Sequence, residues 1–200
     1  MTDARLPLRF SAYDETAGEP NVVVDGSPNA GTVVVLSHWP GMPTPAGCEA
    51  DSSCQIAFRY LDRGADQHGE ARVVTNNHFD QDGLTGVYAL VDPESALCRR
   101  ALLEGLASAG DFAVASDRTA ARLSMAVAAL SDPERSPLGN LPEAYDQRCA
   151  LLYDAGLRLL PTWLEDPQRC RELWAEEDAE LDAAEALVAS GKVPIDEHPD

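Results

Sequence analysis

Basic residues are scarce in this 200-residue sequence. Fifteen Lys and Arg stand against 34 Asp and Glu, which gives a formal net charge of -19 at pH 7. A surface of this charge repels the phosphate backbone of nucleic acids, so we do not expect a partner among long nucleic acids. A bound divalent cation would reverse the field at one place, and small phosphorylated substrates therefore stay compatible with the sequence.

Several diagnostic patterns are also missing. The five Cys are odd in number and form no C-x-x-C pair, which argues against a disulfide framework and a zinc knuckle. No stretch approaches the roughly 18 apolar residues of a membrane span, and the first ten residues contain no apolar signal core. We therefore predict a cytoplasmic protein with reduced thiols and no membrane partner. The chain also lacks the Walker, G-x-G-x-x-G and G-x-S-x-G motifs.

Short β-branched runs alternate with segments of helical periodicity. Strands are predicted at Val22–Asp25 and Thr32–Leu36, joined by a tight turn, at residues 71–77, and at residues 112–116 after Asp111. Helices are predicted after Asp51 or Ser52, after Gly83, from Asp92 towards Gly110, and from Ser116 or Asp117 to Asp132. This alternation predicts an α/β protein: a three-layer α/β/α fold with a mostly parallel, Rossmann-like sheet.

Only helices are expected in the last part of the chain. One apolar stripe begins at Leu141 and is expected to break at Pro161, and a second helix with a dense acidic face follows Pro167. We predict an α/β domain over residues 1–140 and a helical C-terminal extension over residues 141–200, packed on the domain as one structural unit.

The most informative segment is NNHFDQDG, residues 76–83, at the end of the predicted third strand. If this segment is extended, His78, Asp80 and Asp82 project to one side. An imidazole beside two carboxylates suits manganese, iron or zinc better than calcium. The alternative is that Asp80 or Asp82 only caps the helix that follows Gly83. The position at the carboxyl end of a parallel strand favours a ligand site.

The stretch VVTNNHFDQDG, followed by an amphipathic helix, resembles the first metal-binding motif of the Asp-His-His (DHH) phosphoesterase superfamily. With LSHWPG, ADSS and AGDF, the resemblance covers about residues 31–130 and is nearest to a little-characterised bacterial branch. It implies a parallel α/β domain whose Asp and His side chains bind divalent metals, most commonly Mn, with Mg, Fe or Zn as alternatives. It also implies that His78, Asp80, Asp82 and Asp111 are metal ligands, with Asp82 and His78 as the catalytic residues.

One departure from the superfamily concerns its naming motif. No Asp followed by two consecutive His occurs, because His38, His68, His78 and His198 are all isolated. The resemblance therefore implies a site that binds one metal or that is completed by other ligands than those of the superfamily. His38, just past the TVVVL run, is a candidate for such a ligand. The candidate substrate-binding residues are His38, Asp51, Ser52 and Asn77, with helix capping as the alternative for Asp51 and Ser52.

The functional prediction is a divalent-metal-dependent hydrolase that acts on a small phosphorylated compound or a short nucleotide. Two alternatives stay open. One is a non-catalytic relative that binds a nucleotide, a metal or a protein partner, and the other is a metal-dependent enzyme for a non-phosphorylated substrate. The sequence leaves the oligomeric state open.

Overall fold

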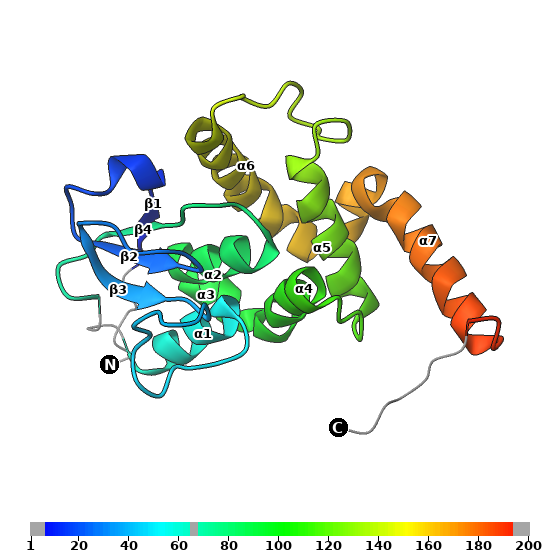
Figure 1. Ribbon diagram of the computed structural model, residues 1–200, viewed down its shortest axis with the longest axis horizontal. Helices are drawn as coiled ribbons and strands as arrows, with labels where there is room; N and C mark the ends of the chain where they lie inside the picture. The colour runs from blue at the N-terminus through cyan, green and yellow to red at the C-terminus, as the bar shows by residue number, and fades with distance from the viewer. Residues whose placement is uncertain (1–6, 65–67, 194–200) are drawn as a thin grey trace.

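The structure, a computed structural model, describes residues 7–64 and 68–193 (Figure 1). Its strands are β1 (Arg9–Phe10), β2 (Asn21–Val24), β3 (Thr32–Leu36) and β4 (Val73–Thr75). Its helices are η1 (Tyr13–Glu15), α1 (Ser53–Asp62), α2 (Gln81–Val91), α3 (Pro93–Cys98), α4 (Arg100–Phe112), α5 (Arg118–Ser131), α6 (Tyr145–Glu165), η3 (Pro167–Cys170) and α7 (Arg171–Ala189). The strands form one parallel sheet in the order β1-β4-β2-β3. The predicted α/β class and parallel sheet are confirmed.

Strand β2 lies inside the sheet, between β4 and β3. Its residues Val22, Val23 and Val24 are fully buried. An uninterrupted apolar run is typical of a parallel strand that is covered on both faces. The next residue, Asp25, therefore leaves the sheet from its interior and not from an edge.

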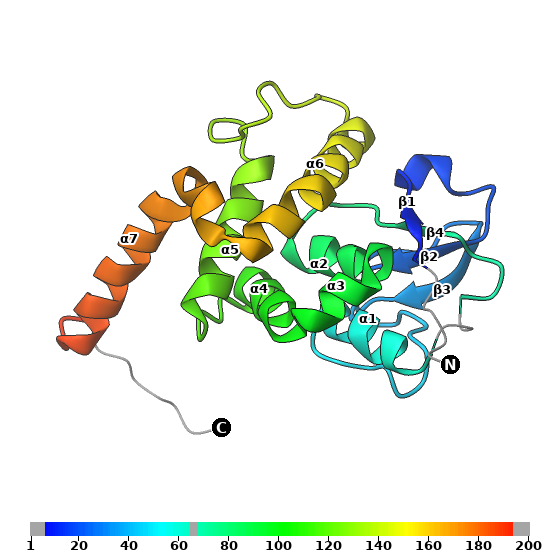
Figure 2. The ribbon, with the colours of Figure 1, turned by 180° about the vertical axis from the view of Figure 1, so that it is seen from behind.

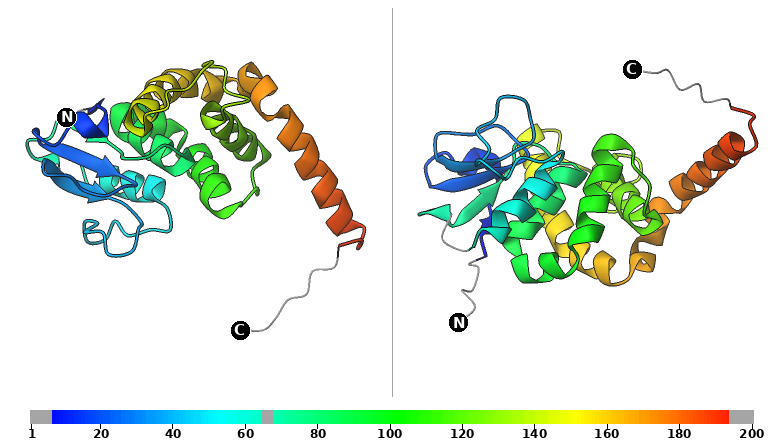
Figure 3. Two further views of the ribbon diagram at one scale, coloured as in Figure 1. Left: turned by 45° about the horizontal axis from the view of Figure 1, so that its top comes forward. Right: turned by 90° about the horizontal axis from the view of Figure 1, so that it is seen from below.

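The connection between β2 and β3 differs from the predicted tight turn. Because the two strands are parallel, residues 25–31 must return along the sheet. Gly26 lies so close to Asn76 and Asn77 that a Cβ there would sit 2.3 Å from Asn77 Oδ1. It also lies against Val23, so this connection covers one face of the sheet while α1 and α2 cover the other. The long helices are consequently gathered on one side of the sheet (Figure 3).

Helices α1 and α2 are positioned by caps that the sequence predicts in part. Ser52 is the N-cap of α1, and its side chain accepts a hydrogen bond from Gln55 N–H. Asp80 is the N-cap of α2 and accepts from Gly83 N–H at 2.8 Å. The N-termini of both helices therefore lie close to the ends of the strands that precede them.

The predicted strand at residues 112–116 is wrong. Helix α4 continues through Gly110 and Asp111 to Phe112, and it ends at Ala113, whose φ of 54° is left-handed. The buried residues Leu103, Leu106 and Ala107 recur at helical spacing. Beyond them, Gly110 packs closely against the side chain of Gln81, which keeps this part of α4 against α2. Phe112 and Val114 remain exposed, without a neighbouring strand to cover them.

The predicted break at Pro161 is also wrong, because α6 continues through it to Glu165. Trp163 and Leu164 are buried beyond the proline, and their packing holds the last turn in place. Helix α6 contacts α2 and α5. Helix α7 packs along α5 as far as Glu185, which pairs with Arg118, and its end extends away from the body (Figure 1). In the described part of the chain, no helix combines the length and apolarity that crossing a membrane requires.

Gly86 tests the packing that holds α1, α2 and β2 together. A Cβ at Gly86 would lie 2.6 Å from Val24 Cγ1 and 3.5 Å from Cys54 Cα. We expect Gly86→Val to lower the free energy of unfolding by about 1–3 kcal/mol, because the fully buried side chain of Val24 has little room to move away. Urea unfolding measures this change. Gly18→Val, at a position with no atom within 4 Å, should have little effect.

Candidate metal centre

Three side chains meet at the carboxyl ends of neighbouring strands. Asp25 follows β2, His38 lies two residues after β3, and His78 lies three residues after β4. Because β4, β2 and β3 are adjacent in the sheet, these ends open to one place. Asp25 has a φ of 50°, an unusual conformation that Asp tolerates better than most residues. The backbone at Asp25 thus directs its carboxylate to a place between His38 and His78.

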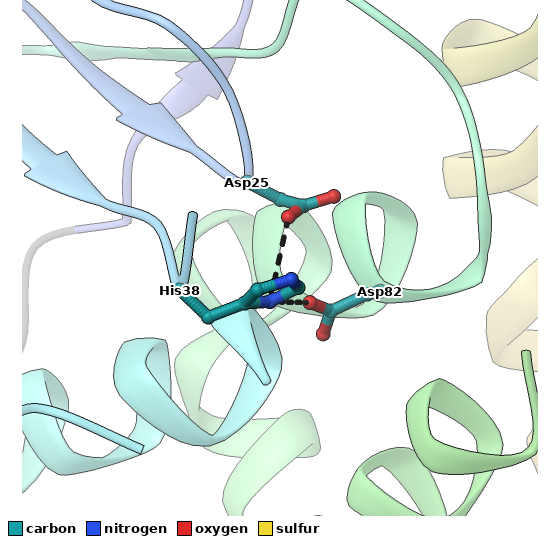
Figure 4. Close-up of side chains that lie close together, drawn as sticks. All are labelled: Asp25, His38 and Asp82. Atoms are coloured by element: carbon teal, nitrogen blue, oxygen red, sulfur yellow. Dashed lines mark hydrogen bonds and ion pairs between the residues drawn. The ribbon is translucent and has the colours of Figure 1, made fainter. Parts of the chain in front are cut away.

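The first cluster contains Asp25, His38 and Asp82 (Figure 4). His38 Nδ1 lies 3.2 Å from Asp82 Oδ2 and 3.8 Å from Asp25 Oδ1. Ser53 supports this arrangement, since its hydroxyl donates to Asp25 Oδ1 at 2.8 Å and accepts from the backbone N–H of His38 at 3.1 Å. Both carboxylates are almost fully buried.

The second cluster contains Asp25, His78 and Asp80. His78 Nε2 lies 3.1 Å from Asp25 Oδ2 and 2.8 Å from Asp80 Oδ2. The ring of Trp39 packs beside His78, with 5.2 Å between the ring centroids. Asp25 therefore belongs to both clusters and presents one oxygen to each.

Asp82 also fastens α2 to α1. Its Oδ2 accepts from Ser53 N–H at 2.6 Å, and its Oδ1 accepts from Cys54 N–H at 2.7 Å. These amides belong to the first turn of α1, where a helix has unpaired donors and the positive end of its dipole. The carboxylate thus serves as an anchor between helices and still has lone pairs for a cation.

The carboxylates influence one another and the imidazoles. Burial raises the pKa of Asp25 despite its hydrogen bond with His78, and the charges of Asp80 and Asp82 act in the same direction. Burial disfavours the charged ring of His78, but hydrogen bonds with Asp25 and Asp80 outweigh this and raise the pKa of His78 to about 10. The hydrogen bond to Asp82 likewise raises the pKa of His38. The cluster therefore favours a positive charge among its carboxylates.

The donor atoms fit a divalent metal. Each cluster offers one imidazole nitrogen and two carboxylate oxygens, and these atoms lie within 4.8 Å of one another. This mixture suits manganese, iron or zinc, and three protein ligands leave positions for water or substrate. A shared carboxylate further allows two neighbouring ions.

A serine nucleophile does not fit the same residues. Ser53 Oγ and Asp82 Oδ2 both approach Nδ1 of His38, at 3.3 and 3.2 Å. A catalytic triad needs the serine and the carboxylate on opposite ring nitrogens. Ser53 is also fully buried, so its hydroxyl cannot reach a substrate.

The structure places His78 and Asp80 in one cluster and Asp82 in the other, with Asp25 shared between them, and not by alternation along a strand. Asp80 is a helix cap, and Asp82 lies in the first turn of α2. The capping and metal-binding interpretations are therefore compatible at Asp80.

Asp111, predicted as a further ligand, lies exposed in the last turn of α4 and in neither cluster. Asp111 nevertheless lies near the site, since the ring of the adjacent Phe112 lies 6.4 Å from that of His38. Desolvation by neighbouring protein atoms and the charges of Asp82, Asp80 and Asp25 raise the pKa of Asp111 to about 7.

The predicted substrate-binding residues have different surroundings. His38 is a member of the first cluster, and the buried Ser52 caps α1. Asn77 Oδ1 accepts from Ser27 N–H at 3.0 Å and holds the connection after β2. Asp51 is exposed and lines a shallow cavity with Phe112 and other residues, so its role stays a prediction.

One residue of the site, Asp25, was not predicted from the sequence. Asp25 directly follows a buried valine run, the same signal that marked NNHFDQDG, but a single Asp before Gly26 also fits an ordinary turn. Ser53, for which the sequence suggests substrate binding or helix capping together with Asp51 and Ser52, instead supports two residues of the site. Its contacts with Asp25 and His38 depend on the packing of α1 against the sheet, which no local pattern reveals.

Comparisons with known proteins give one family. Residues 6–200 match the model of a family of unknown function, DUF6687. No curated protein and no solved structure matches the chain.

Proposed function

The chain belongs to a family of unknown function, DUF6687, and we propose from its own residues that it is a divalent-metal-dependent hydrolase of small phosphorylated compounds. One observation carries this proposal: Asp25 is shared by two His/Asp clusters at the carboxyl ends of adjacent parallel strands. Manganese is the proposed metal, and the resemblance of NNHFDQDG to DHH phosphoesterases supports the same reaction class.

Some residues of the site would bind the metal ions, and others hold these ligands in position. His38 and Asp82 would hold one ion, His78 and Asp80 the other, and Asp25 would bind both. Bound divalent cations lower the pKa of a water molecule and polarise a phosphoryl oxygen. Ser53 fixes the rotation of Asp25 through its hydroxyl. The ring of Trp39, packed beside that of His78, would limit the rotation of the imidazole.

The choice of a small substrate rests on charge. The net charge of -19 disfavours a long polyanion, whereas a single phosphoryl group can be held by cations at the clusters. A cytoplasmic location is part of the proposal, and it is supported by five unpaired thiols, since reduced cysteines are typical of that compartment.

A panel of substrates tests the reaction class. Metal-stripped protein, reloaded with manganese, should hydrolyse bis-p-nitrophenyl phosphate, p-nitrophenyl phosphate or pyrophosphate, and EDTA should abolish the activity. His78→Ala should reduce turnover by at least about 100-fold, because it removes a ligand. His68→Ala removes a histidine that contacts Tyr60 away from the site and should retain activity. Turnover of p-nitrophenyl acetate alone would instead favour a non-phosphorylated substrate.

A non-catalytic role is the second candidate, and one observation favours it. Every carboxylate of the clusters already has hydrogen-bond partners: Ser53 and His78 for Asp25, Gly83 for Asp80, and two α1 amides for Asp82. Such a network can hold the strand ends in place without a metal. Manganese that leaves the melting temperature unchanged would support this candidate.

A further inference from the structure

A second cavity lies where α6, η3 and the start of α7 meet, in the helical region seen from behind in Figure 2. Its volume is about 750 Å³, within the range of small-molecule sites. The lining includes the indole of Trp163 and the side chains of Leu159 and Leu173. None of the residues of the candidate metal centre line it.

Three arginines surround this apolar cavity: Arg158 on α6, Arg169 in η3 and Arg171 at the start of α7. Glu172 is the only acidic residue of the lining. This concentration of positive charge stands out in a chain with a net charge of -19. The residues that line the cavity therefore carry a net positive charge, opposite in sign to that of the whole protein.

Two of these arginines are only loosely paired. Arg158 and Arg169 lie 3.9 Å from the exposed carboxylates of Asp154 and Asp166. By contrast, Arg118 contacts the buried Asp178 at 2.6 Å. Long contacts between exposed groups contribute little free energy, so Arg158 and Arg169 can turn to another anion at small cost.

We infer that this cavity binds a small organic anion. The apolar part of the ligand would lie against Trp163 and the leucines, and its carboxylate or phosphate would be held by Arg158, Arg169 and Arg171. Guanidinium groups suit this task because their planar donors match the oxygens of carboxylate and phosphate. The inference is independent of the proposed hydrolase function, because the metal centre has no part in it.

Calorimetric titration of metal-stripped protein tests this inference, with 2-naphthoate and 2-naphthyl phosphate as probes. At least one of them should bind at a single saturable site, about tenfold or more tighter than neutral 2-naphthol or inorganic phosphate. Added salt should weaken the binding. Preference for one probe would identify the anionic group that the arginines select.

A double variant, Arg158→Gln with Arg169→Gln, should weaken this binding by at least about tenfold. Both side chains are exposed, so the fold should persist, and circular dichroism checks this. Arg148→Gln is the matched control: Arg148 lies on the same helix, over the Tyr145 ring and outside the cavity. Binding by neither anion, equal binding of 2-naphthol, or unchanged binding by the double variant would each overturn the inference.

Discussion

Asp25→Asn is expected to abolish most metal-dependent turnover and to leave the metal-free fold intact. The variant removes the charge of the one carboxylate shared by both clusters. Loss of such an electrostatic group typically lowers kcat by about 10²- to 10³-fold. Asn also tolerates the left-handed backbone at this position, where φ is 50°, so the strand end should keep its shape.

The stability of the same variant separates a functional role from a structural one. Burial raises the pKa of Asp25, which means that folding disfavours its ionised form. The variant removes the cost of burying this charge but weakens the hydrogen bond with His78. Because these two effects oppose each other, we expect the free energy of unfolding in EDTA to change by less than about 1 kcal/mol. Unfolding in urea measures this, with Asp14→Asn, an exposed substitution, as the control. A large loss of stability with normal turnover would assign Asp25 a structural role.

Asp82→Ala, unlike Asp25→Asn, should destabilise the protein even without metal. The variant leaves the amides of Ser53 and Cys54 without their acceptor in a fully buried place. Two unpaired donors and the loss of a helix-terminal anion correspond to about 3 kcal/mol. For a chain of this size we expect the melting temperature to fall by roughly 6–12 °C.

The measurement for Asp82→Ala is thermal unfolding in EDTA, so that metal loss does not contribute. Asp14→Ala, in an exposed position, should melt like the wild-type protein. A shift of less than about 2 °C would mean that the contact between α2 and the first turn of α1 contributes little.

Local signals predicted much of what positions the site. The β-branched runs before Asp25 and His38 and the caps at Ser52 and Asp117 depend on neighbouring residues, and the structure has them as expected. NNHFDQDG was recognised because three ligand-type side chains lie within five residues. The pattern of a short segment is sufficient for such features.

The completion of the site depends on strand order, which the sequence does not reveal. Asp25 and His38 reach His78 only because β2 lies between β3 and β4 in the sheet. The resemblance to DHH phosphoesterases implied that Asp111 is a ligand, at the start of a strand predicted from the short apolar run after it. Such a run does not distinguish a strand from the end of a helix. Packing of α4 decided that question in favour of the helix.

The metal content of the purified protein tests the central claim most directly. Wild-type protein that is reloaded with manganese and desalted should retain about two ions per chain, because two clusters share Asp25. Asp25→Asn should retain fewer than one, and Asp14→Asn should match the wild type. Elemental analysis that finds no retained metal in the wild type would contradict the account, and a single ion unaffected by Asp25→Asn would contradict the shared carboxylate.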